Sequence, residues 1–150
     1  MTRVICIEGL GSSFIQSLLI PKLPEQGLVF HLKSWGHDLG GIKAVLGKTV
    51  IIGHSLGGAV AVKLANRIGC DHLITLDPRI PGLQSLSPFN AFGSLKVTGA
   101  KVAMNMNHAN YFGWFPGLTV QGATNVVVGG SHVGLPGNQR VVDYVKAVIE

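Results

Sequence analysis

Ser55 has the surroundings most typical of a catalytic residue in this sequence. It lies in Gly53-His54-Ser55-Leu56-Gly57, which fits the G-x-S-x-G turn that lifts a serine hydroxyl clear of a sheet. A serine hydroxyl is a poor nucleophile until a neighbouring imidazole takes its proton, and that imidazole needs a carboxylate to fix its tautomer and stabilise its charge. A histidine and an acid must therefore meet Ser55 in the fold.

The segments on either side of Ser55 predict the strand and helix that such a turn requires. The β-branched run at 49–52 is typical of a strand buried on both faces, and apolar residues at 59–68 recur with helical spacing until Gly69 ends the helix. Strand and helix pass so closely at such a turn that a Cβ would collide. Gly53 and Gly57 are therefore predicted to be glycine for steric reasons.

Two acids lie between Ser55 and the last helix, and a parallel sheet distinguishes them. The carboxyl ends of its strands emerge along one edge, where ligands bind. Asp71 falls at the beginning of the strand expected at 71–76, on the edge opposite Ser55, whereas Asp77 follows its end. Asp77 is therefore the predicted acid, although Asp77-Pro78 is also a common turn or helix cap.

The same edge leaves two candidates for the catalytic base. His72 begins its strand and is excluded, so His108 and His132 remain. His132 follows the last strand in a glycine-flanked loop that can reach back over Ser55, which makes it the predicted base, with His108 as the alternative. The other histidines are expected to have no direct catalytic role: His31, His37 and His54.

An oxyanion formed during acyl transfer needs hydrogen-bond donors. The N–H of Leu56, at the expected helix start, is one candidate. The other lies in the glycine-rich loop after the first strand, at Leu10 or Gly11. A strand, a glycine-rich loop and a helix in this order can point backbone N–H groups at an anion, although the loop is also typical of a tight strand-to-helix turn.

Strands and helices are predicted to alternate along the whole chain. Strands are expected at 3–8, 27–32, 49–52, 71–76, within 96–106 and at 125–128. Helices are expected at 14–20, closed by Pro21, from Asp38 through Leu46, at 59–68, and at the C-terminus on the stripe Val141, Val142, Val145 and Ile149. This alternation predicts an α/β fold, a three-layer sandwich with a mostly parallel sheet of about six strands, in a single domain over residues 1–150.

Composition narrows the class of protein. Of the 150 residues, 47% are hydrophobic and 13% charged, which suits one domain whose sheet is covered on both faces. The net charge is +5, but the twelve Lys and Arg are scattered, so no nucleic-acid partner is expected. No metal-ligand spacing is visible, and Cys6 and Cys70 are expected to be buried thiols. Without a signal sequence or an apolar run of roughly 18 residues, the chain is expected to be cytoplasmic, with no stable membrane insertion.

Several segments resemble the α/β-hydrolase superfamily in a minimal, lid-less form. Segment 5–12, Ile-Cys-Ile-Glu-Gly-Leu-Gly-Ser, is similar to its oxyanion loop, segment 53–58, Gly-His-Ser-Leu-Gly-Gly, to the elbow of lipases and esterases, and the loop of His132 to its histidine loop. The order Ser55, Asp77, His132 is that of the superfamily. Segment 75–78, Thr-Leu-Asp-Pro, is similar to lipases whose acid follows the next strand after the nucleophile. The usual first two strands, a separate lid domain and a His-Gly pair in the oxyanion loop have no counterpart.

The resemblance implies a serine hydrolase that cleaves carboxylic esters through an acyl-Ser55 intermediate, without metal or cofactor. Its substrate would be a small-molecule or lipid ester. The same residues would serve amides, thioesters or acyl transfer to an alcohol, and a non-catalytic binding module of the same fold is the alternative class. An aromatic segment rich in Gly, Pro and Asn is predicted to be a loop that holds the acyl group, or else part of the core: Tyr111, Phe112, Trp114 and Phe115.

Overall fold

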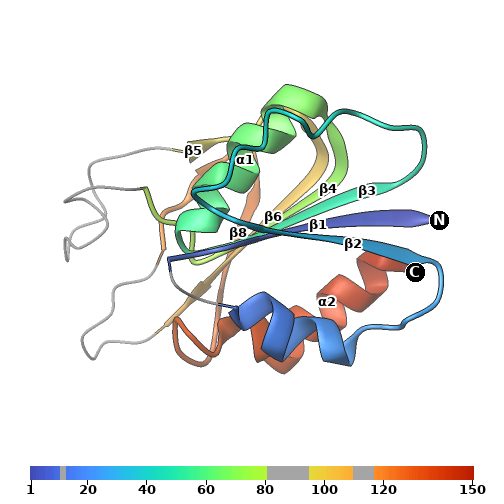
Figure 1. Cartoon of the computed structure of the whole chain (residues 1–150). Helices are drawn as coiled ribbons and strands as arrows, with labels where there is room; N and C mark the ends of the chain where they lie inside the picture. Colours follow the sequence, from blue (N-terminus) through green and yellow to red (C-terminus); the bar gives the residue numbers. More distant parts are fainter. Residues whose placement is uncertain (11–12, 81–94, 110–116) are drawn as a thin grey trace.

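The computed structural model describes residues 1–10, 13–80, 95–109 and 117–150 (Figure 1). Its main sheet has six strands in the order β2-β1-β3-β4-β6-β8, and every pair of neighbours is parallel. These strands are β1 (Thr2–Glu8), β2 (Leu28–Ser34), β3 (Thr49–His54), β4 (Cys70–Leu76), β6 (Ala100–His108) and β8 (Thr124–Val128). The α/β class and the parallel six-stranded sheet are as predicted.

Helices cover both faces of the sheet (Figure 1). One face carries α1 (Leu56–Ile68), packed with the loop after β2 and with a second, two-stranded sheet of β5 (Leu95–Lys96) and β7 (Val120–Gln121). The other face carries four other helical elements of the described residues: η1 (Ile15–Leu19), η2 (Ile20–Lys22), η4 (Leu135–Gly137) and α2 (Gln139–Ile149).

Strand β3 shows why the central strands are apolar throughout. All of its residues are buried. Val50 and Ile52 belong to the core beneath α2, while Ile51, which points the other way, belongs to the core beneath α1. A strand between two helical layers buries both of its faces, and each fully buried aliphatic side chain contributes about 1.5–3 kcal/mol. Two cores, one on each face, therefore hold the central strands in place.

Two predicted helices differ from the structure. No helix forms from Asp38 through Leu46; instead, Asp38 Oδ1 accepts a hydrogen bond from the N–H of Gly40 at 2.7 Å, which closes a local turn. Leu39 is buried, but the Leu46 side chain is fully exposed, so the apolar residues do not share one face. The helix predicted at 14–20 forms as a π-helical turn, η1, followed by a 3₁₀ turn, η2, that contains Pro21 instead of ending before it.

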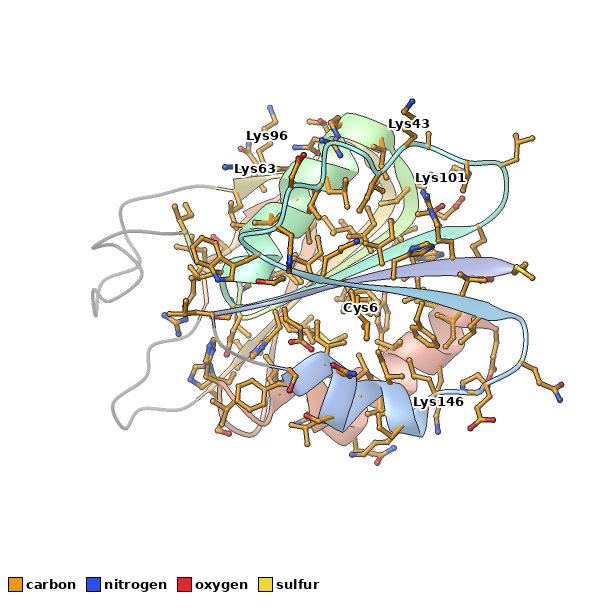
Figure 2. All side chains as sticks on the ribbon, viewed as in Figure 1. Cys6, Lys43, Lys63, Lys96, Lys101 and Lys146 are labelled. Atoms are coloured by element: carbon orange, nitrogen blue, oxygen red, sulfur yellow. The ribbon has the colours of Figure 1, made fainter. Side chains whose placement is uncertain are left out.

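The two cysteines are free and buried, as predicted. Figure 2 shows Cys6 in the interior, on the sheet, whereas Lys43, Lys63, Lys96 and Lys101 lie at the outer surface on separate elements. Within the described ranges, no helix has the length and apolar character needed to cross a membrane.

Candidate active site

The carboxyl ends of the strands bring the predicted catalytic residues to one edge of the sheet. Ser55 directly follows β3 and Asp77 directly follows β4, and the last residues of these two strands are paired in register. His108 is the last residue of β6 and pairs with the last residue of β8, after which the chain enters the loop of His132. Four side chains that are far apart in sequence therefore start from neighbouring points.

The residues that sequence reasoning excluded lie at the opposite edge. Asp71 forms an ion pair with Lys101, at 2.7 Å, and accepts a hydrogen bond from the N–H of Thr49 at 2.8 Å. His72 pairs in register with Val50, near the start of β3. The structure thus separates Asp71 and His72 from Ser55, as the strand order predicts.

The backbone at Ser55 has the sharp turn predicted from the flanking glycines. Ser55 has φ 55° and ψ −125°, a conformation that costs a non-glycine residue about 1–3 kcal/mol. A Cβ on Gly53 would lie 2.4 Å from the carbonyl oxygen of Gly57, and a Cβ on Gly57 would lie 2.1 Å from that of Ile7. At Gly53 the strand and helix of the turn leave no room for a Cβ, as predicted, whereas at Gly57 the obstacle is the neighbouring strand β1.

Ser55, His132 and Asp77 form a hydrogen-bonded line. His132 Nε2 lies 3.0 Å from Ser55 Oγ, and His132 Nδ1 lies 3.0 Å from Asp77 Oδ2. Because an ionised carboxylate only accepts, Nδ1 carries the proton and Nε2 is left to accept the hydrogen of the serine. Asp77 is fully buried and His132 nearly so. This geometry allows His132 to act as a general base toward Ser55.

Asp77 accepts hydrogen bonds at both of its oxygens. Oδ1 accepts from the N–H groups of His108, at 2.8 Å, and Gly117, at 3.2 Å, and Oδ2 accepts from the rings of His132 and His108. Burial raises the pKa of Asp77, but the hydrogen bonds from the His132 ring and from the His108 N–H outweigh burial and lower it. Asp77 is therefore held in its ionised form.

His108, the alternative candidate for the base, contacts Asp77, the predicted acid. Its ring Nδ1 hydrogen-bonds Asp77 Oδ2, while the nitrogen that faces Ser55 Oγ belongs to His132. The two imidazoles share the carboxylate, with ring centroids 5.9 Å apart. The structure therefore assigns different positions to the two histidines that sequence reasoning left in competition.

His54 packs against the ring of His132 and hydrogen-bonds its backbone. It is fully buried, and its Nε2 donates a hydrogen bond to the carbonyl oxygen of His132 at 2.8 Å. Burial, together with the charge of His132, lowers the pKa of His54 to about 4, so its imidazole is neutral near pH 7. His54 thus fixes the backbone of the histidine loop. The remaining histidines, His31 and His37, are exposed and lie away from this contact.

Gly9 and Gly117 are site residues that the sequence reasoning did not identify. A Cβ on Gly9 would lie 2.8 Å from Ser55 Cβ and 3.4 Å from its Oγ, so the loop after β1 lies directly against Ser55. A Cβ on Gly117 would lie 2.4 Å from Asp77 Cα. The run of glycines after β1 was a signal for Gly9, but no local pattern marks Gly117, which meets Asp77 across 40 residues of sequence.

The structure describes Leu56 and Leu10, two of the three residues predicted to donate to the oxyanion. Leu56 is the first residue of α1, where backbone N–H groups have no partner within the helix. Leu10 follows Gly9 in the loop against Ser55, with an exposed side chain, so that only its backbone is suited to a role. Other predicted site residues fall outside the described ranges: Gly11, Tyr111, Phe112, Trp114 and Phe115.

Two further charged residues are buried at this edge. Glu8, the last residue of β1, accepts a hydrogen bond from the N–H of Gln16 at 2.8 Å and so spans the loop that touches Ser55; burial raises its pKa. Arg79 donates its backbone N–H to the carbonyl oxygen of Ser55 at 2.9 Å. Burial lowers the pKa of its guanidinium, while the charge of Asp77 opposes this effect.

Asp77, His108 and His132 are also the group of described residues whose side chains could hold a metal ion, since their ligand atoms lie within 4.8 Å of one another. No linear spacing in the sequence marks this cluster, because each member comes from the end of a different strand. The Nδ1 atoms of both histidines are directed at Asp77 Oδ2, an arrangement that also satisfies all three side chains through hydrogen bonds.

Comparisons of the chain with models of protein families, with curated proteins and with solved structures gave no match. Its chemistry is therefore inferred from the geometry of the residues around Ser55.

Proposed function

We propose that this protein is a serine hydrolase that cleaves carboxylic esters through an acyl-enzyme on Ser55. The observation that carries the proposal is the line of two 3.0 Å contacts, from Ser55 Oγ to His132 Nε2 and from His132 Nδ1 to Asp77 Oδ2. Nucleophile, base and acid thus stand in the order that activates a serine hydroxyl.

The proposed reaction has two halves. Ser55 Oγ attacks the ester carbonyl carbon as His132 Nε2 takes its proton, and Asp77 stabilises the resulting imidazolium. The tetrahedral intermediate then expels the alcohol, which receives the proton from His132, and leaves the acyl group on Ser55. In the second half, His132 takes a proton from water, the hydroxide adds to the acyl carbon, and the carboxylic acid leaves as the proton returns to Ser55.

The N–H of Leu56 and a backbone N–H of the loop at Leu10 or Gly11 are the proposed donors to the oxyanion. The position of Leu56 at the start of α1 supports its N–H as a donor, because the unpaired N–H groups and the dipole of this helix favour negative charge. The closeness of Gly9 to Ser55 Oγ supports the second, because it brings the loop backbone to the nucleophile.

We also propose that the chain is a minimal, lid-less member of the α/β-hydrolase superfamily. The all-parallel sheet, the positive φ of Ser55 and the order of nucleophile, acid and histidine support this assignment. On that basis the substrate is a small-molecule or lipid ester, and the aromatic residues at 111–115 are proposed to hold its acyl group. Amide or thioester hydrolysis and acyl transfer to an alcohol would use the same three residues.

A non-catalytic binding module is the alternative from another class. Steady-state and burst kinetics with p-nitrophenyl esters of increasing chain length separate the two. An esterase releases nitrophenol either in a burst equal to the enzyme concentration or at a steady rate. Ser55→Ala should abolish this release, with kcat lowered by a factor on the order of 10⁶. A binding module would give the same background rate for both proteins.

A further inference from the structure

We propose that His108 is a positioning residue for the catalytic acid: it acts as a neutral hydrogen-bond donor to Asp77 and thereby sets the pH at which His132 accepts the proton of Ser55. This inference rests on the proposed function, since it assigns His132 as the base. It gives a positioning role to a buried histidine that the acyl-transfer steps do not use.

The first step of the argument is that one residue holds both oxygens of the acid. The backbone N–H of His108 donates to Asp77 Oδ1 at 2.8 Å, and its ring Nδ1 contacts Asp77 Oδ2. Both side chains are fully buried. Hydrogen bonds to a carboxylate at both oxygens fix the plane of the group, so His108 determines the direction in which Oδ2 faces His132.

The second step concerns the proton of His108. Asp77 is ionised, so the ring nitrogen that meets it must be the one that carries a hydrogen. A neutral His108 supplies this donor with its single ring N–H at Nδ1. A protonated His108 would place a second positive charge beside the imidazolium of His132, against the single negative charge of Asp77, in a buried site where uncompensated charge is costly.

The third step is competition for one oxygen. Oδ2 accepts from His108 and from His132 at the same time. The bond from His108 disperses part of the negative charge that would otherwise stabilise a protonated His132. Loss of the His108 donor therefore leaves Asp77 more able to stabilise that proton, so that His132 becomes deprotonated only at higher pH.

Other charged groups near the acid do not change with His108. His54, from the end of β3, faces His132 and Asp77 and is neutral above about pH 4 because its pKa is lowered to about 4. Arg79, two residues after Asp77, acts on both Asp77 and His54. These groups are present in every variant, so the variants differ only in the side chain at position 108.

Two substitutions separate the donor from the bulk of the ring. His108→Leu removes the ring donor but keeps the backbone N–H that binds Oδ1. His108→Asn keeps a donor, because the Asn Nδ2 lies as many bonds from Cα as the Nδ1 of histidine. If His108→Leu does not fold, His108→Gln takes its place, since its amide extends one bond further and does not occupy the Nδ1 position. His31→Asn, on the exposed edge strand β2, is the control.

The pH profile of kcat/KM provides the first readout. We expect His108→Leu to move its midpoint upward by about one pH unit and to lower kcat about tenfold, with KM changed less than about twofold. We expect His108→Asn to return the midpoint to within about 0.2 pH unit of the wild type, as His31→Asn does. If His108 only stabilised the fold, His108→Leu would lower the free energy of unfolding without moving the midpoint of the pH profile.

NMR titration of the His132 ring provides the second readout, which does not depend on turnover. The same upward shift is expected for the His108→Leu variant, with recovery in His108→Asn. If no ester is hydrolysed but the NMR shift occurs, the proposed function fails and the role of His108 stands. If the His132 titration is unchanged in His108→Leu, or if His108→Asn is as inactive as His132→Ala, the proposal is overturned.

Discussion

His54 donates a hydrogen bond from Nε2 to the carbonyl oxygen of His132, at 2.8 Å and across 78 residues of sequence. The turn that carries Ser55 and the loop that carries His132 are thereby joined by the residue before Ser55. The ring centroids of the two histidines lie 4.8 Å apart, so a charge on one ring is felt by the other. A neutral His54 places no positive charge beside the ring of His132.

The neutral state of His54 predicts how stability depends on pH. In the unfolded chain a histidine has a pKa near 6.5, whereas burial lowers the pKa of His54 in the fold to about 4. The unfolded state therefore binds a proton first as the pH falls, and the free energy of unfolding decreases between about pH 6.5 and pH 4. Between about pH 7.5 and pH 5, this residue alone accounts for a loss of about 2 kcal/mol.

Urea denaturation of the wild type and His54→Gln at both pH values measures that contribution. The wild type should lose about 2 kcal/mol more than the variant, because only the wild type carries the histidine whose pKa is lowered by burial. His31→Gln, at an exposed position, serves as the control and should follow the wild type. Equal losses in the wild type and His54→Gln would show that His54 is not held neutral.

Gly57→Ala should destabilise the fold by about 3 kcal/mol or more, because the added Cβ would overlap backbone atoms that have no room to move. The nearest atom, the carbonyl oxygen of Ile7, would be 2.1 Å away. Gly41→Ala is the matched control, since its Cβ would meet nothing within 4 Å, and should change the free energy of unfolding by less than about 0.5 kcal/mol. Similar unfolding midpoints in urea for the two variants would contradict the close approach of α1 to β1.

Asp77→Asn should lower kcat by about 10⁴, because an amide N–H₂ facing His132 Nδ1 cannot accept its hydrogen and favours the wrong tautomer. Asp71→Asn, at the opposite edge, should leave kcat within about twofold, since its partners are Lys101 and the N–H of Thr49. Steady-state ester hydrolysis by the two variants is the measurement. If Asp71→Asn lowered kcat more than Asp77→Asn, the catalytic acid would be the one at the start of β4 and not the one that follows its end.

Removal of metal ions should leave ester hydrolysis unchanged. Asp77, His108 and His132 lie close enough to bind a cation, but the proposed reaction uses them as hydrogen-bonded groups. Dialysis against a chelator should keep kcat/KM within about twofold of the untreated protein. A loss of activity that Zn²⁺ restores would instead assign these residues to a metal centre.

The sequence was sufficient to predict the edge at which the site forms. Ser55 and Asp77 follow short apolar strands whose ends are clear in the pattern, and the pairing of His54 with Leu76 aligns these ends. The steric need for Gly53 was also predictable, since a strand-to-helix turn this tight excludes a Cβ, whereas the obstacle at Gly57 is the backbone of β1. Such features depend on local pattern and on the general geometry of parallel sheets.

The contacts of His108 and Gly117 were not predictable, because they depend on the direction of side chains and loops after the strands end. His108 and His132 both reach the edge, and only the rotamers show that the ring of His108 contacts Asp77 while the ring of His132 connects Asp77 to Ser55. The helix predicted from Asp38 was wrong because Asp38, expected as its cap, closes a local turn on Gly40, and Leu39 packs inward while Leu46 is exposed. Pattern alone does not tell a helix face from a packed loop.

Reaction with a fluorophosphonate, followed by mass spectrometry of the peptide that contains Ser55, tests the central claim most directly. We expect a stoichiometric adduct on Ser55 in the wild type and none on that peptide in Ser55→Ala. Labelling of His132→Ala should be slowed by several orders of magnitude, because the serine then lacks its base. Absence of an adduct in the folded wild type, or labelling of Ser55→Ala at a comparable rate, would contradict the assignment of Ser55 as the nucleophile.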